Sequence, residues 1–209
     1  MRPKTRSDYH HGDLRRALID GAVQTIARRG IGALNLRQLS ARVGVTSGAP
    51  YHHFANREDL LAAIADDGFR RLEAELVAAR DAVAEAGARL EALGEAYVRF
   101  AIAHPGYFRV MFHGDAMGSG LTEAGLRSFE LLRDAVLACQ KTGAAPAGDP
   151  APLVMTVWSA VHGFATLWVE GALPFEGNDP NAMTPEIGRM IARSFAALAR
   201  ETLGLEVSN

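Results

Sequence analysis

The side chains that could do chemistry gather between residues 34 and 57, and they are of the kinds that read double-stranded DNA. Arg37 carries the guanidinium group that pairs best with the O6 and N7 atoms of guanine. A second set stands where a short helix is expected to begin, and such N-terminal residues can reach base edges: Ser47, Gly48, Ala49 and Pro50. Gly48 would let the backbone approach DNA closely, and Ala49 or Pro50 could touch thymine methyl groups.

Two short helices separated by a turn are predicted to position these side chains. Asn35 is a good N-cap for a helix over residues 36–43, and Gly44 ends that helix because glycine enters the left-handed conformation cheaply. Thr46 caps a second helix over about residues 47–53 and offers its hydroxyl to a phosphate. This pattern is typical of a helix-turn-helix that places its second helix in the major groove.

The charge distribution supports contact with a polyanion in the first part of the chain. Residues 1–60 hold ten Lys or Arg against five Asp or Glu, whereas the remainder holds twelve against nineteen. The overall net charge of −2 therefore hides a basic segment followed by an acidic one. Such an asymmetry indicates that the basic part binds nucleic acid and the acidic part does not.

Residues 11–60 resemble the DNA-binding domain of TetR-type (tetracycline-repressor-like) transcriptional regulators. The matching segments are an amphipathic first helix, GIGALNLRQLSARVGV, PYHHF and NREDLL. The resemblance implies that Arg37 contacts a base. It also implies that the sugar-phosphate backbone is held by Tyr51, His52, His53 and Arg57.

Helical periodicity runs through nearly every segment, so we expect an all-α protein. Nine helices are predicted, three in a DNA-binding domain over residues 1–56 and six in an effector-binding and dimerisation domain over residues 57–209. The helices are expected over about 11–29, 36–43, 47–53, 57–80, from after Gly87 to 104, 105–112, 121–141, 151–171 and 185–203. The nine-helix division matches the plan of the TetR type.

The last two predicted helices are expected to form a homodimer. The helix over 151–171 is apolar on more than one stripe, so one side can meet a ligand chamber and the other a partner subunit. The predicted dimer contacts on these two helices are Leu153, Val157, Ala160, Phe164, Leu167, Ile187, Ile191, Ser194, Phe195 and Leu198.

An effector pocket is expected in the second domain, where aromatic and methionine side chains concentrate beside a Pro-Gly break. The predicted lining residues are Phe100, His104, Tyr107, Phe108, Met111, Phe112, Met117, Trp158 and His162. Trp158, His162 and Gly163 resemble a Trp-His-Gly signature of one TetR-type subgroup. Few charges occur in the set, so a small and mainly hydrophobic effector is expected, and ordinary core packing is the alternative for the cluster.

Other chemistries lack a matching constellation. The pairs His10-His11 and His52-His53 point about 100° apart on a helix, and no Cys or carboxylate completes a metal site. A single cysteine, Cys139, is typical of a protein in the reducing cytoplasm. No nucleophile and base are spaced as in the active site of an enzyme, and we expect no cofactor. We therefore expect a cytoplasmic, non-enzymatic, ligand-responsive repressor with no membrane association. An activator, a ligand-independent repressor and a helical protein-interaction module are the alternatives.

Overall fold

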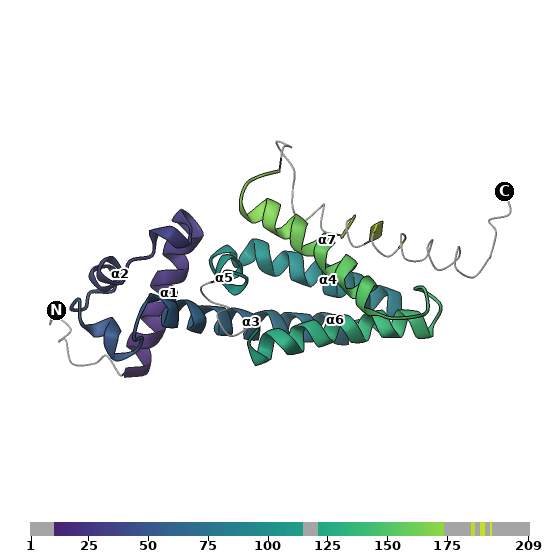
Figure 1. Ribbon diagram of the computed structural model, residues 1–209, viewed down its shortest axis with the longest axis horizontal. Coiled ribbons are helices and arrows are strands. Elements are labelled where there is room, and N and C mark those ends of the chain that lie inside the picture. Colours follow the sequence, from purple (N-terminus) through teal and green to yellow (C-terminus); the bar gives the residue numbers. More distant parts are fainter. Residues whose placement is uncertain (1–10, 115–120, 174–184, 187–188, 191–192, 194–209) are drawn as a thin grey trace, which may run out of the picture. The chain divides into compact units, whose positions relative to one another are not determined.

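A computed structural model describes residues 11–114, 121–173, 185–186, 189–190 and 193. These residues form helices joined by short turns, without a strand in the described ranges (Figure 1). The elements are α1 (His11–Arg29), η1 (Ile31–Ala33), α2 (Leu36–Val43), η2 (Ala49–His52), α3 (Arg57–Asp81), α4 (Ala86–Ala103), α5 (Pro105–Met111), α6 (Glu123–Lys141) and α7 (Ala151–Val169). The expected all-α fold is confirmed.

Two details differ from the expected helix count. The predicted second helix of the helix-turn-helix is a single 3₁₀ turn, η2, rather than an α-helix over residues 47–53. Its short length follows from Pro50, which lacks the N–H group that a longer helix would use. Most of the predicted helix over 185–203 lies outside the described residues.

The chain divides into two compact units, and the first is built around α1. Unit 1 takes residues up to Gly68 together with Gly106–Gly120, so it includes the first part of α3 and most of α5. Helix α1 packs against η1 and α2, and α2 packs against η2. The core of this unit contains Leu18, Ile26, Leu39, Phe54, Leu60, Ile64 and Met111.

Helix α5 is fastened to unit 1 by close packing and by hydrogen bonds. A Cβ atom on Gly106 would lie 2.3 Å from the carbonyl oxygen of Val23 in α1, so only glycine fits there. Arg109 donates from Nη1 to the carbonyl oxygens of Ile26 at 3.3 Å and Ala27 at 2.8 Å. The hydroxyl of Tyr107 donates to Asp67 Oδ2 at 2.8 Å. Unit 1 therefore contains residues from both predicted domains, and the domain boundary at residue 56 stays a prediction.

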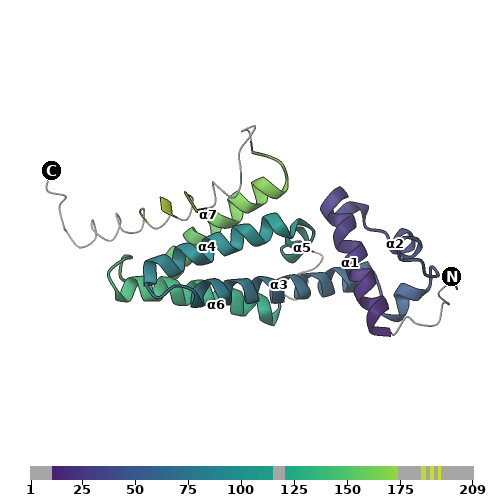
Figure 2. The same cartoon turned by 180° about the vertical axis from the view of Figure 1, so that it is seen from behind.

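Unit 2 contains residues 69–105 and 121 onward, and α4 packs against both α6 and α7. Both views show α6 running alongside the later part of α3 (Figures 1 and 2). Arg127 of α6 joins the two helices, because its Nε and Nη2 atoms donate to the Glu73 carboxylate at 2.6 and 3.0 Å. That hydrogen bond to Arg127 lowers the pKa of Glu73.

Helix α7 buries one stripe and leaves much of the rest accessible. The buried stripe is Val154, Val157, Val161 and Ala165. Val157 is only 2% exposed, which corrects its expected place in a dimer interface, because the side chain belongs to the core of its own unit. By length and composition alone α7 is the one described helix that could cross a membrane, and 22% of its apolar window is buried.

Candidate nucleic-acid interface

Helix α2 holds Arg37 on a well-defined first turn. The Asn35 side chain accepts hydrogen bonds from the backbone N–H groups of Arg37 at 2.9 Å and Gln38 at 3.2 Å. Leu36 and Leu39 are buried beneath this turn, and Gly44 ends the helix in the left-handed conformation with φ 81°. The predicted N-cap and C-cap are confirmed. Arg37 lies between the buried Leu36 and Leu39 in the sequence and is itself exposed, so its guanidinium can extend from the surface.

The turn and η2 present a second exposed set. Thr46, Ser47 and Gly48 are exposed, and Ala49 is half-buried. Tyr51 is 52% exposed, and His52 beside it is exposed as well. These side chains belong to the same small helical unit as Arg37 and can contact DNA without any rearrangement of the core.

Pro50 does not belong to this exposed set. Its side chain is buried, and its carbonyl oxygen accepts from the N–H groups of His53 and Phe54, both at 2.9 Å. The predicted contact between Pro50 and a thymine methyl group is therefore wrong. Pro50 anchors η2 in the core instead, since a proline ring is apolar and fits the first turn of a helix.

His53 and Arg57 are held by the protein as well as being near the surface. The His53 ring is half-buried and lies 6.5 Å from the Phe54 ring. The Nη2 atom of Arg57 donates to the carbonyl oxygen of Ile31 at 3.1 Å, and its Nη1 atom lies 3.7 Å from Glu58 Oε1. Arg57 thus links the start of α3 to η1, a positioning contact that the sequence did not reveal.

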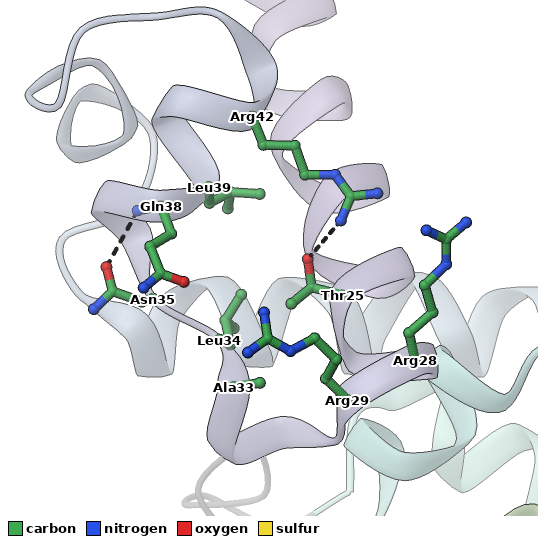
Figure 3. Close-up of a pocket in the computed structure, with 9 residues that line it drawn as sticks. All are labelled: Thr25, Arg28, Arg29, Ala33, Leu34, Asn35, Gln38, Leu39 and Arg42. Atoms are coloured by element: carbon green, nitrogen blue, oxygen red, sulfur yellow. Dashed lines mark hydrogen bonds between the residues drawn. The ribbon is translucent and has the colours of Figure 1, made fainter.

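A cationic pocket in unit 1 was not predicted from the sequence. It has a volume of about 240 Å³ (Figure 3). Its lining residues are Thr25, Arg28, Arg29, Ala33, Leu34, Asn35, Gln38, Leu39 and Arg42. The three arginines stand in the last turns of two consecutive α-helices, which could have indicated the pocket. Basic residues are common in the last turn of a helix, so their positions gave no reason to expect a shared site.

The residues predicted to line an effector pocket are divided between the two units. Tyr107, Phe108, Met111 and Phe112 belong to unit 1, whereas Phe100, His104, Trp158 and His162 belong to unit 2. Met117 lies outside the described residues. Phe100 is fully buried with the His104 ring 5.0 Å away, and Tyr107 and Met111 are core residues around Asp67 and Gly68.

Trp158 and His162 form an aromatic cluster with residues of α4 and α6 in unit 2. The Nδ1 atom of His162 and the hydroxyl of Tyr97 are joined by a 2.8 Å hydrogen bond. The Trp158 ring lies 5.3 Å from the His162 ring and 6.2 Å, edge to face, from that of Phe129. Burial lowers the pKa of His162 and raises that of Tyr97, so both are neutral at pH 7. A neutral, aromatic, part-exposed cluster suits an uncharged group.

The predicted dimer residues on α7 are only partly accessible. Ala160 and Leu167 are exposed, and Leu153 and Phe164 are half-buried. The predicted contacts on the following helix, Ile187, Ile191, Ser194, Phe195 and Leu198, lie outside the described residues.

Chemistry other than binding has little support within the ranges that the structure describes. No group of three His, Cys, Asp or Glu side chains there could hold a metal ion. Cys139 is buried and its thiol donates to the carbonyl oxygen of Ala86 at 3.5 Å. Burial raises the pKa of this thiol, so Cys139 is not an activated nucleophile.

Comparison with known proteins assigns the family. Residues 18–64 match the family described as bacterial regulatory proteins of the tetR family. Residues 90–201 match the tetracyclin repressor-like C-terminal domain. The chain belongs to the TetR family. Its helix-turn-helix, α2 and η2 with the turn between them, falls inside the first match, and most of α4 and all of α5 to α7 fall inside the second. The Trp-His-Gly subgroup is not confirmed by these matches and stays a prediction.

Individual relatives of this TetR-family chain agree with the fold. A protein of unknown function from Rhodococcus sp. RHA1 is 35% identical with a TM-score of 0.75, over 91% of this chain and 100% of the other. AibR, solved in complex with isovaleryl coenzyme A and operator DNA, is 19% identical with a TM-score of 0.66, over 87% and 98%. An HTH-type transcriptional repressor of Mycobacterium tuberculosis is 34% identical over 79 residues, 38% of this chain. The match spans 41% of that repressor's length.

Proposed function

We propose that this chain is a sequence-specific DNA-binding transcriptional regulator that acts as a homodimeric repressor. The observation that carries the proposal is the surface formed by Arg37 and the exposed Thr46, Ser47, Tyr51 and His52. Arg37 stands on α2, which is capped at both ends and anchored by the buried Leu36 and Leu39. The other side chains stand on η2 or on the turn before it, where the buried Pro50 is the anchor. A rigid surface of this kind can fit the major groove with little loss of conformational entropy on binding.

Arg37 is proposed to read a guanine, and Tyr51 and His52 to hold phosphates on either side of it. Base contacts set the sequence preference, whereas phosphate contacts set the register. His53 and Arg57 join the interface as second contributors, because each already has a partner within the protein.

The accessible face of α7 supports the homodimer. Met155 is 46% exposed and Leu167 is 47% exposed on a helix with no charged side chain between Ala151 and Val169. Covering such a face stabilises an apolar helix in water. The dimer contacts proposed on α7 are Leu153, Met155, Ala160, Phe164 and Leu167. This set omits the buried Val157 and adds the exposed Met155. A mass in solution of twice 22.4 kDa is expected, and a monomer at micromolar concentration would contradict the dimer.

An effector is proposed to bind in unit 2 near Trp158 and His162. The support is the neutral aromatic cluster that these residues form with Tyr97 and Phe129. The structure of AibR with both isovaleryl coenzyme A and operator DNA indicates that this fold can combine the two kinds of ligand. Release from the operator follows if the effector prefers a conformation that binds DNA less well.

The experiment is to select operator sequences with the purified full chain and to measure affinity by fluorescence anisotropy. For wild type, a selected operator should bind much more tightly than scrambled DNA. Arg37→Ala should lose about 5- to 150-fold of the discrimination at one base pair, the effect of one good bidentate contact. Arg133→Ala, an exposed arginine of α6, is the matched control and should leave the discrimination unchanged.

Two results would contradict the proposal. A wild-type chain that enriches no sequence would exclude sequence-specific regulation, and the protein-interaction alternative would replace it. Equal loss on every operator variant for Arg37→Ala would move that residue from base reading to phosphate binding.

A further inference from the structure

The pocket between the end of α1 and the start of α2 has no role in the function proposed so far. Three guanidinium groups, those of Arg28, Arg29 and Arg42, gather around Thr25 at its rim (Figure 3). No carboxylate is among its lining residues. A concave site whose described lining holds three cations and no carboxylate attracts an anion from solution.

The C-terminal end of α1 does not by itself explain Arg28 and Arg29. Basic residues in the last turn of a helix often neutralise its negative C-terminal end. In α1 that end is already occupied, because Arg109 donates to the carbonyl oxygens of Ile26 and Ala27. In the described part of the chain, neither Arg28 nor Arg29 has a carboxylate within ion-pair distance. Their charges are available for a ligand.

Arg42 is held in place before any ligand binds. Its Nη2 atom donates to Gln24 Oε1 at 2.7 Å, and its Nη1 atom donates to Thr25 Oγ1 at 3.1 Å. Thr25 is fixed in turn, since its hydroxyl donates to the carbonyl oxygen of Gly21 at 2.8 Å. The remaining N–H groups of a fixed guanidinium form a fork that matches phosphate oxygens.

The size and the floor of the pocket favour one ligand over others. At about 240 Å³ it is smaller than the roughly 300–1,000 Å³ typical of small-molecule sites. Its floor includes the buried Leu34 and Leu39, so it combines apolar carbon with a cationic rim. A nucleic-acid backbone has the same combination, because the C–H faces of a deoxyribose lie next to a charged phosphate. A fragment of a larger molecule fits such a small volume better than a whole effector does.

The position of the pocket along α2 indicates which larger molecule. Asn35 and Gln38 line the pocket, and Arg37 lies between them in sequence on the exposed first turn. Neighbouring Cα atoms are about 3.8 Å apart, so the backbone that carries Arg37 adjoins residues of the pocket lining on both sides. If Arg37 enters a groove, a phosphate that borders this groove is the anion nearest to the pocket lining.

We propose that Arg28, Arg29 and Arg42 form a phosphate-binding pocket that takes one sugar-phosphate unit of the operator backbone beside the groove read by Arg37. The proposal rests on the DNA-binding function proposed above. Its contribution is to affinity and register, equally on every sequence, because a phosphate carries no sequence information. Arg28, Arg29 and Arg42 would thus set affinity and register, whereas Arg37 would set the sequence preference.

The test is the salt dependence of DNA binding by the full chain. The double variant Arg28→Gln/Arg29→Gln should weaken binding roughly tenfold at low salt on operator and scrambled DNA alike. It should also reduce the slope of log K against log[NaCl] by about 0.9 for each lost phosphate contact. Arg28→Lys/Arg29→Lys keeps the charges and should retain most of the slope, which separates a charge effect from misfolding. Arg133→Gln in unit 2 is the matched control and should leave the slope unchanged.

A second measurement locates the phosphate. Each operator phosphate near the Arg37 contact is replaced in turn by an uncharged methylphosphonate. One or two of these replacements should weaken wild type but have little further effect on the glutamine variant, since the contact is already absent. If every methylphosphonate weakened DNA binding by the glutamine variant as much as binding by wild type, the pocket assignment would be overturned.

The possible sources of the anion are distinguished by thermal unfolding in inorganic phosphate against chloride at equal ionic strength. If phosphate stabilises wild type and not the glutamine variant while DNA binding stays the same in both, the pocket binds a free anion and the proposal is overturned. An unchanged slope in the glutamine variant also overturns it. The ratio of operator to scrambled affinity tests the proposed function separately, because the pocket affects both DNAs equally.

Discussion

Replacing Gly106 by alanine tests the attachment of α5 to α1. The added Cβ atom would stand 2.3 Å from the Val23 carbonyl oxygen and 2.9 Å from Val23 Cγ1. Ordinary carbon–oxygen contacts are about 3.3–3.6 Å, so the two helices must separate by roughly 1 Å or α5 must leave its place. The obstacle is backbone inside a helix, which cannot rotate away as a side chain can.

The size of the effect follows from two opposing contributions. Overpacking of a well-packed core costs typically about 1–3 kcal/mol. Alanine recovers up to about 1 kcal/mol relative to glycine inside a helix, and less near its first turn, where Gly106 lies. We expect a net loss of about 1–3 kcal/mol. For a chain of this length, this loss corresponds to a decrease in Tm of about 2–12 °C.

The assay is thermal unfolding followed by circular dichroism at the helix band. Fluorescence would be a poor probe, since both tryptophans, Trp158 and Trp168, are in α7 of unit 2. Gly32→Ala is the control, because a Cβ there meets nothing within 4 Å. Gly68→Ala should be intermediate, since its Cβ meets side chains and not backbone, namely Met111 Cγ and Sδ at 2.8 Å and Tyr107 Cδ1 at 3.3 Å. Equal stability of the Gly106→Ala and Gly32→Ala variants would refute the close packing of α5 against α1.

Two further predictions concern a cap and an ion pair. Asn35→Ala should lower the free energy of unfolding, measured by urea titration, by about 1 kcal/mol, because it removes the N-cap of α2. Asn35→Asp keeps a capping oxygen and should retain the stability of wild type. An equal loss of stability in both variants would contradict a capping role. Glu73→Gln should lower Tm at pH 7 by removing the carboxylate that Arg127 stabilises. Because the folded pKa of Glu73 lies below 4.5, the stabilisation is present above that pH and lost as the pH falls through the folded pKa. The gap between wild type and Glu73→Gln should therefore close in acid, while the exposed Glu130→Gln shows no such gap at pH 7.

The helix boundaries were largely predictable from the sequence. The expected span of residues 11–29 agrees with α1, the expected 36–43 with α2, and the expected 57–80 with α3 to within one residue. These boundaries depend on caps and breakers that act within a few residues of the chain. Asn35 and Gly44 needed no tertiary information to be identified, and the exposed position of Arg37 followed from the apolar period on either side of it.

Side-chain roles were predicted less well wherever distant segments meet. Pro50 was expected at DNA and is buried in unit 1. Val157 was expected at a subunit interface and instead packs inside unit 2. In both cases the residue type was compatible with either place, since apolar side chains fill cores and interfaces alike.

The sequence by itself determined an α-helical chain with a basic N-terminal helix-turn-helix, because periodicity, caps and net charge are local or additive properties of the chain. Membership of the TetR family came from the motifs that resemble that family, and the family matches confirmed it. Only the tertiary structure decided that Arg109, eighty-two residues after Ala27, closes the end of α1. It also brought Arg28, Arg29 and Arg42 to one pocket. Such contacts depend on how whole helices pack, and the identity of the partner is not encoded near either residue.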